Sequence, residues 1–167
     1  MIFYNIKIKT ICIISIKKTQ QLPSIPIKMT ALYGGSHTKL IQYKVNSTTN
    51  IESLQRNTSN VEKKKLRYVW LKNSLYTNIT FARSLWNLID QNNIIKKMKN
   101  NNPLGLSLIK HQIDINKNVH ELYYCYCKEF ENILQIKKPI WGRKYTIVNS
   151  NNYNIIIQEF FSPDIVL

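Results

Sequence analysis

The sequence has few cysteines and few glycines, and both shortages narrow the functions that it can serve. The three cysteines, Cys12, Cys125 and Cys127, are odd in number and include a C-x-C spacing that is too close for an easy disulfide, so we expect a reducing compartment. The four glycines form no phosphate-binding loop and no dinucleotide-binding fingerprint, and the chain has no nucleophile elbow. The standard motifs of nucleotide-binding proteins and of serine hydrolases are therefore absent.

Histidine is scarce as well, and its positions do not indicate a metal site. His37, His111 and His120 lie near no cysteine or carboxylate pattern with the spacing of metal ligands. From the pattern alone, each histidine is interpreted first as a surface or structural residue. We expect no bound metal.

Long hydrophobic runs are also missing. The apolar stretch at residues 11–16 is flanked by lysines, is too short to span a membrane and lacks a small-residue cleavage site. We therefore expect no transmembrane segment and no secretory signal. A length of 167 residues suits one domain. We assign residues 29–167 to that domain and residues 1–28 to an N-terminal extension or an edge strand.

What the chain has in abundance is isoleucine, asparagine and lysine, with 26 Ile, 20 Asn and 20 Lys against 2 Ala and 4 Arg. Because the abundant three have A/T-rich codons, we infer a gene in an A/T-rich genome, such as that of a plastid, a parasite or an endosymbiont. The net charge of +15 would ordinarily indicate a nucleic-acid or anionic-membrane partner. Here scattered lysines are explained by codon drift on solvated faces, and a functional basic surface is the alternative. The rare arginines and glycines become the positions to inspect.

The pattern of apolar residues indicates an α+β fold, with an antiparallel β-sheet flanked by helices. A helix is expected within residues 34–44, with Ser36 as its N-cap, and further helices within 87–102 and 103–111. Residues 120–130 are ambiguous, since their beginning suits a helix, but their tyrosine and cysteine content favours a strand. The other expected strands are residues 2–16, 51–57, 66–73, 78–86 and a closing hairpin of 142–149 and 153–161.

Two charged residues stand inside apolar strands, Arg67 in the strand at 66–73 and Glu159 in the last strand. If the sheet brings both into one interior cavity, they form a charged pair in low dielectric. A guanidinium there fits a carboxylate, and a carboxylate there can interact with a hydroxyl group. Together they would hold a small, flat molecule with an acid at one end and a hydroxyl at the other. The alternative is a buried salt bridge without a ligand.

Six segments, in order along the chain, resemble elements of the chorismate lyase (chorismate–pyruvate lyase) family, and within it the open-reading-frame branch encoded in algal plastid genomes. The segments span residues 34–163. They are GGSHTKL at 34–40, LRYVWL at 66–71, FARS at 81–84, NPLGLSL at 102–108, WGRKYTI at 141–147 and IIIQEFFSP at 155–163.

The resemblance implies an antiparallel sheet with an enclosed ligand cavity covered by mobile flaps. It implies cleavage of chorismate to 4-hydroxybenzoate and pyruvate without metal or cofactor, for the synthesis of a quinone, which in a plastid would be plastoquinone. The implied location is the plastid (chloroplast) stroma.

The resemblance also implies roles for individual residues. Arg67 would bind the ring carboxylate, and the backbone of Leu104 would touch the ligand from a flap. Glu159 would lie at the hydroxyl or ether-oxygen end and, with its pKa raised by burial, would donate a proton to the departing ether oxygen. Arg67 and Glu159 are thus the expected catalytic residues. His37 stands where the bacterial enzymes commonly carry a ligand-contacting Met. A titratable imidazole that can form hydrogen bonds therefore takes the place of a thioether in the wall of the expected cavity.

Two other functions compete with the lyase. One is a non-catalytic domain that binds a small aromatic acid, as in the ligand-sensing domains of some bacterial transcription regulators, which are similar in fold to this family. The other is RNA binding through scattered lysines, with Tyr123, Tyr124 and Tyr126 as stacking groups. We expect a small-molecule substrate and no nucleic-acid partner. The oligomeric state does not follow from the sequence.

Overall fold

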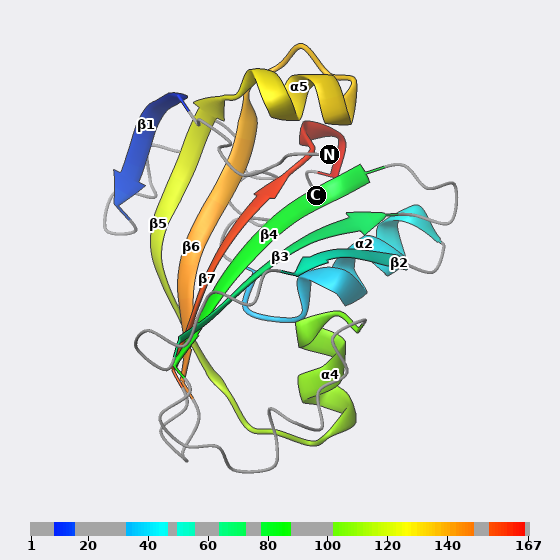
Figure 1. Ribbon diagram of the computed structural model, residues 1–167, viewed down its shortest axis with the longest axis vertical. Helices are drawn as coiled ribbons and strands as arrows, with labels where there is room; N and C mark the ends of the chain where they lie inside the picture. The colour runs from blue at the N-terminus through cyan, green and yellow to red at the C-terminus, as the bar shows by residue number, and fades with distance from the viewer. Residues whose placement is uncertain are drawn as a thin grey trace.

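The computed structural model describes residues 9–15, 33–46, 50–55, 64–72, 78–87, 102–148 and 154–165. These residues form one seven-stranded sheet, in the order β1-β5-β6-β7-β4-β3-β2, and every neighbouring pair is antiparallel (Figure 1). The strands are β1 (Lys9–Ser15), β2 (Asn50–Gln55), β3 (Lys64–Lys72), β4 (Asn78–Asn87), β5 (Asn116–Tyr126), β6 (Ile140–Val148) and β7 (Asn154–Phe161). The α+β class with an antiparallel sheet flanked by helices is confirmed.

Strand alternation gives the sheet two different faces, because successive side chains point to opposite sides. On β3, Arg67, Val69 and Leu71 line a pocket on one face, whereas Trp70 belongs to an aromatic core on the other. That aromatic core is closed by α5 (Lys128–Leu134), whose Phe130 packs among residues of several strands. The sheet therefore separates an aromatic structural core from the face that carries the pocket.

Two helices lie over the pocket face, α2 (His37–Val45) and α4 (Leu104–Lys110), and they contact each other. Figure 1 shows α2 beside β2 and β3 and α4 below them. Helix α2 begins at Ser36, whose Oγ accepts a hydrogen bond from the Lys39 backbone N–H at 3.4 Å. This confirms the predicted N-cap. Helix α4 follows Pro103, a residue that suits a helix N-terminus because it has no backbone N–H to donate. None of the helices in the described ranges is long and apolar enough to cross a membrane.

Most predicted elements are confirmed, and one boundary is wrong. The segment 120–130 does not form one strand, since β5 ends at Tyr126 and α5 starts at Lys128. Glu129 and Glu131 lie in the first turn of α5, where negative charge is favourable to a helix N-terminus. The helix expected within 87–102 lies almost entirely outside the described residues. Strand β1 lies at one edge of the sheet, and the division of the chain at residue 28 stays a prediction.

Candidate ligand-binding site

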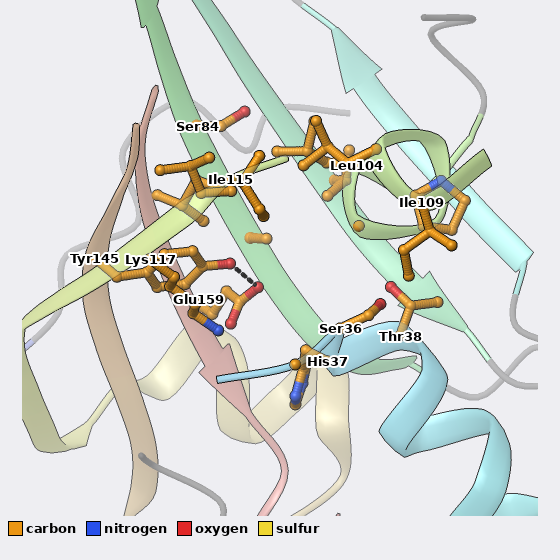
Figure 2. A pocket seen from close by; sticks show the side chains of 18 of the residues that line it. Ser36, His37, Thr38, Ser84, Leu104, Ile109, Ile115, Lys117, Tyr145 and Glu159 are labelled. Atoms are coloured by element: carbon orange, nitrogen blue, oxygen red, sulfur yellow. Dashed lines mark hydrogen bonds between the residues drawn. The ribbon is translucent and has the colours of Figure 1, made fainter. Parts of the chain in front are cut away.

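A pocket of about 290 Å³ lies between one face of the sheet and the two helices α2 and α4 (Figure 2). Five strands form its floor, and the loop before α2 and the start of α4 form its other side. Most of its lining is apolar, with a few polar groups among the hydrophobic side chains. Such a lining is typical of a site for a small, largely apolar molecule with a few polar substituents.

All four residues predicted for the site line this pocket: His37, Arg67, Leu104 and Glu159. They come from α2, β3, α4 and β7, so residues far apart in the sequence converge on one cavity. The Arg67 Nη2 donates to the backbone oxygen of Asn102 at 3.0 Å, which connects β3 to the segment before α4. The guanidinium is buried, and burial lowers its pKa. The roles of these four residues in binding and catalysis stay proposals.

The predicted ion pair between Arg67 and Glu159 is wrong. Glu159 Oε2 accepts a hydrogen bond from Arg143 Nε at 2.9 Å, and Arg143 is fully buried. The sheet register explains the choice, since Arg143 and Glu159 are directly opposite on β6 and β7, whereas Arg67 lies on β3, two strands away from β7. Directly opposed cross-strand side chains are the closest pairs in an antiparallel sheet.

The second oxygen of Glu159 is also engaged, since Oε1 accepts a hydrogen bond from the hydroxyl of Tyr145 at 2.7 Å, as Figure 2 shows. Burial by itself would raise the pKa of Glu159, but the charges of Arg143, His37 and Lys117 and the Tyr145 hydrogen bond outweigh it and lower the pKa to about 2. Glu159 is therefore ionised at neutral pH. The prediction that it stays protonated and acts as a proton donor is wrong, because the sequence did not reveal the arginine beneath it.

His37 lies at the start of α2, with its ring among buried groups. Its Nε2 makes a hydrogen bond of 3.1 Å with Thr80 Oγ1, and its Nδ1 is buried without a hydrogen-bond partner in the described part of the chain. Burial and the positive charges of Arg143 and Lys117 lower the pKa of His37 to about 4, against the opposing effect of Glu159. The imidazole is therefore neutral at neutral pH.

Three further residues complete the site: Arg143, Tyr145 and Lys117. Lys117 lines the pocket from β5, donates from Nζ to the backbone oxygen of Tyr33 at 3.1 Å, and places Nζ 4.2 Å from the centre of the Tyr145 ring. Burial, together with Arg143, lowers its pKa to about 8. Burial also raises the pKa of Tyr145 well above its ordinary value, so that its hydroxyl keeps its proton.

Sequence reasoning missed these three residues to different degrees. Arg143 is directly opposite Glu159 in the β6–β7 register, and Tyr145, two residues further on, lies on the same face of β6, so the predicted closing hairpin contained a signal for both. Lys117 is one of 20 lysines, and nothing in the sequence distinguishes it. Within the described residues, no group of three or more His, Cys, Asp or Glu side chains could hold a metal ion.

Helix α4 is held closely against the loop before α2. A Cβ added at Gly105 would lie 2.7 Å from Ser36 Oγ, so the absence of a side chain allows the two helix starts to approach. Both starts contribute to the pocket lining. The pocket's helical side is thus set by contacts between small residues.

The fold of this chain is similar to that of solved structures. The crystal structure of PhnF from Mycobacterium smegmatis matches with a TM-score of 0.55, 8% sequence identity and coverage of 81% of this chain and 67% of that chain. The isolated effector domain of PhnF matches with a TM-score of 0.52, 7% identity and coverage of 78% and 90%. At these identities the likeness concerns the fold, which is the chorismate lyase-like α+β sheet.

The sequence comparisons define the family. Residues 30–166 match the family described as "Chorismate pyruvate-lyase Rv2949c-like", and the chain belongs to it. The "Uncharacterized protein ycf21" of Antithamnion sp. is 32% identical over 133 residues, which cover 78% of this chain and 74% of that protein. The protein of the same name from Porphyra purpurea is 29% identical over 147 residues, covering 84% and 83%. These relatives are plastid-encoded proteins of red algae.

Proposed function

We propose that the chain is a chorismate lyase, which cleaves chorismate to 4-hydroxybenzoate and pyruvate in the stroma of a plastid, where the product feeds plastoquinone synthesis. The observation that carries the proposal is one pocket of about 290 Å³ that contains a buried arginine, an ionised glutamate and a lysine among apolar walls. Its volume suits a molecule with one six-membered ring. Family membership supports the reaction class.

The reaction is balanced without a second substrate. Chorismate is a dianion, and loss of the enolpyruvyl group breaks one carbon–oxygen bond and one ring carbon–hydrogen bond. The ring proton ends on the methylene carbon of the departing group, which becomes the methyl group of pyruvate, and the products are two monoanions, one of them with an aromatic ring. Aromatisation makes the cleavage strongly downhill, so the protein has to bind the ring, orient the side arm and stabilise the redistribution of charge.

Each site residue has a specific part in this proposal. Arg67 holds the ring carboxylate, for which a planar guanidinium is the best-fitting donor. Glu159, which is ionised and fixed by Arg143 and Tyr145, accepts a hydrogen bond from the ring hydroxyl and so sets the orientation of the ring. The backbone of Leu104 closes over the ligand, and His37 contacts it from the start of α2. Opening of the segment 103–106 would then control product release.

The test is an assay of the purified full chain with chorismate, with 4-hydroxybenzoate and pyruvate measured separately. We expect both products in a 1:1 ratio above the enzyme-free blank. Arg67→Ala should lower kcat/KM by about 10–100-fold, because a charge-assisted hydrogen bond to a carboxylate contributes about 1.5–3 kcal/mol. Arg83→Ala is the matched control, since Arg83 is an exposed arginine outside this pocket, and it should leave kcat/KM unchanged.

A second function is favoured by one observation, the shared fold with the PhnF effector domain. In that case the chain binds a small aromatic acid without cleaving it. Folded protein that binds 4-hydroxybenzoate but releases no product from chorismate would overturn the lyase proposal and support this binding function. Equal turnover by wild type and Arg67→Ala would instead remove Arg67 from the mechanism.

A further inference from the structure

Lys117 places a primary amine inside the pocket, at a position that the proposed roles above leave unused. It extends from β5, and Figure 2 shows it beside Tyr145 and near Glu159. Its Nζ donates to one backbone oxygen, that of Tyr33, and lies over the Tyr145 ring at 4.2 Å. These two contacts fix where the ammonium group lies relative to the pocket floor.

In the described surroundings the charge of Glu159 acts on this ammonium group, but no carboxylate forms an ion pair with it. In the described ranges, no acidic side chain lies within ion-pair distance of Lys117 Nζ, and both oxygens of Glu159 already accept hydrogen bonds from Arg143 and Tyr145. An ammonium has three donors, and the Tyr33 oxygen uses one of them. A half-buried cation with remaining donors in a mainly apolar pocket is stabilised when an anion enters.

The sheet order sets Lys117 apart from Arg67. Arg67 lies on β3 and Lys117 on β5, with β4, β7 and β6 between them. Neighbouring strands are about 4.8 Å apart, so the two backbones stand on opposite sides of the pocket floor and both side chains line the same cavity. A ligand that pairs an anionic group with each of the two cations carries two acidic groups, one for each side of the pocket.

We propose that Lys117 forms a second anion-binding subsite of the pocket, which takes a ligand's second carboxylate, carried on an arm opposite the ring carboxylate held at Arg67. The inference rests on the proposed function and names its substrate class, a ring acid with a second carboxylate on an ether-linked side arm. It also predicts how product leaves, because a ring acid that has lost the arm no longer contacts Lys117. The structural alternative is that Lys117 only holds the Tyr33 backbone and the Tyr145 ring in place.

A pair of unreactive ligands separates these roles. 3-(Carboxymethoxy)benzoate and 3-methoxybenzoate share the ring, the ring carboxylate and the ether oxygen, and they differ by one carboxylate. Dissociation constants are measured by titration calorimetry for the full-length wild type and for Lys117→Met, Lys117→Arg and Lys110→Met. Lys110 is an exposed lysine at the end of α4 and does not line the pocket, so Lys110→Met is the matched control for loss of one positive charge.

We expect the wild type and Lys110→Met to bind the dicarboxylate at least about 10-fold more tightly than the monocarboxylate, which corresponds to about 1.4 kcal/mol. Lys117→Met should abolish this preference and leave the affinity for 3-methoxybenzoate within about twofold, and Lys117→Arg should retain most of the preference. Equal weakening of both ligands in Lys117→Met, or an intact preference, would overturn the subsite. Wild type that binds 3-methoxybenzoate without preferring the dicarboxylate would overturn the subsite alone, whereas folded wild type that binds neither would overturn the proposed function as well.

Discussion

Residues 143 and 144 on β6 each form an ion pair of the same length in very different surroundings. Arg143 and Glu159 are 2.9 Å apart with side-chain exposures of 0% and 10%, whereas Lys144 and Glu121 are 2.9 Å apart with exposures of 37% and 33%. Solvent screens the second pair and not the first. The structure therefore contains an internal comparison of a buried and an exposed ion pair on one strand.

Arg143→Met should destabilise the protein by about 3–5 kcal/mol, because it leaves the ionised Glu159 buried without its guanidinium. Lys144→Met should cost less than about 1 kcal/mol. Urea unfolding followed by circular dichroism measures both. The double variant Arg143→Met/Glu159→Gln should be more stable than Arg143→Met alone, since no charge is then left unpaired. If Arg143→Met lowers the free energy of unfolding no more than Lys144→Met does, the buried Glu159 does not depend on the Arg143 guanidinium for its stability.

At the scale of elements, the contact between α4 and the start of α2 can be tested with Gly105→Ala. Its effect on the free energy of unfolding should have opposite signs with and without the Ser36 side chain. Gly105→Ala adds a Cβ that would lie 2.7 Å from Ser36 Oγ and 3.3 Å from Ser36 Cβ, so Ser36 must give up its N-cap position. Loss of a cap and overpacking together cost about 1–3 kcal/mol. This outweighs the gain of about 1 kcal/mol from alanine's higher helix propensity.

In wild type, Gly105→Ala should therefore lower the free energy of unfolding, by up to about 2 kcal/mol. In a Ser36→Gly background the clash is gone, and the same substitution should raise the free energy of unfolding by up to about 1 kcal/mol. Urea unfolding of the four proteins gives both differences. The same effect in both backgrounds would mean that α4 does not rest on Ser36.

The elements were largely predictable, and their arrangement was not. Alternation identified β3 and β7, and a serine before an apolar run identified the start of α2, because these signals are local. Which strands become neighbours depends on long-range pairing. From the sequence we predicted Arg67 and Glu159 in one pocket, and we also predicted an ion pair between them. In the structure the β6–β7 register places Arg143 opposite Glu159, and these two residues form the ion pair. Lys117 could not be predicted, since its role comes only from where β5 lies.

For the whole molecule, the relevant question is which charges govern its stability. The chain carries 24 basic and 9 acidic residues, and most of its lysines in the described ranges are at least partly exposed. Salt screens the repulsion among exposed charges, with a Debye length of about 3 Å at 1 M ionic strength. Buried groups are screened much less, so at high salt the pH dependence of stability reports on groups such as His37 and Glu159.

The shifted pKa of His37 determines whether stability rises or falls with pH. Its pKa is about 4 in the folded protein and 6.5 in the unfolded chain, so below pH 6.5 the unfolded state binds more protons. Stability is therefore complete above pH 6.5 and falls as the pH drops from 6.5 to about 4, by up to about 3 kcal/mol. The low pKa of Glu159, about 2 against 4.5, adds a second loss only as the pH falls below 4.5.

Urea unfolding at 1 M salt between pH 8 and pH 4 should therefore show a decline that starts near pH 6.5 in wild type. His37→Gln keeps a polar group beside Thr80 but cannot titrate, so its curve should stay nearly level down to pH 4.5. His111→Gln is the matched control, because His111 is exposed, and its curve should follow that of wild type. If the stability of His37→Gln falls with pH as much as that of wild type, other groups cause the loss. The conclusion that His37 is a buried, neutral imidazole at the edge of the pocket would then be wrong.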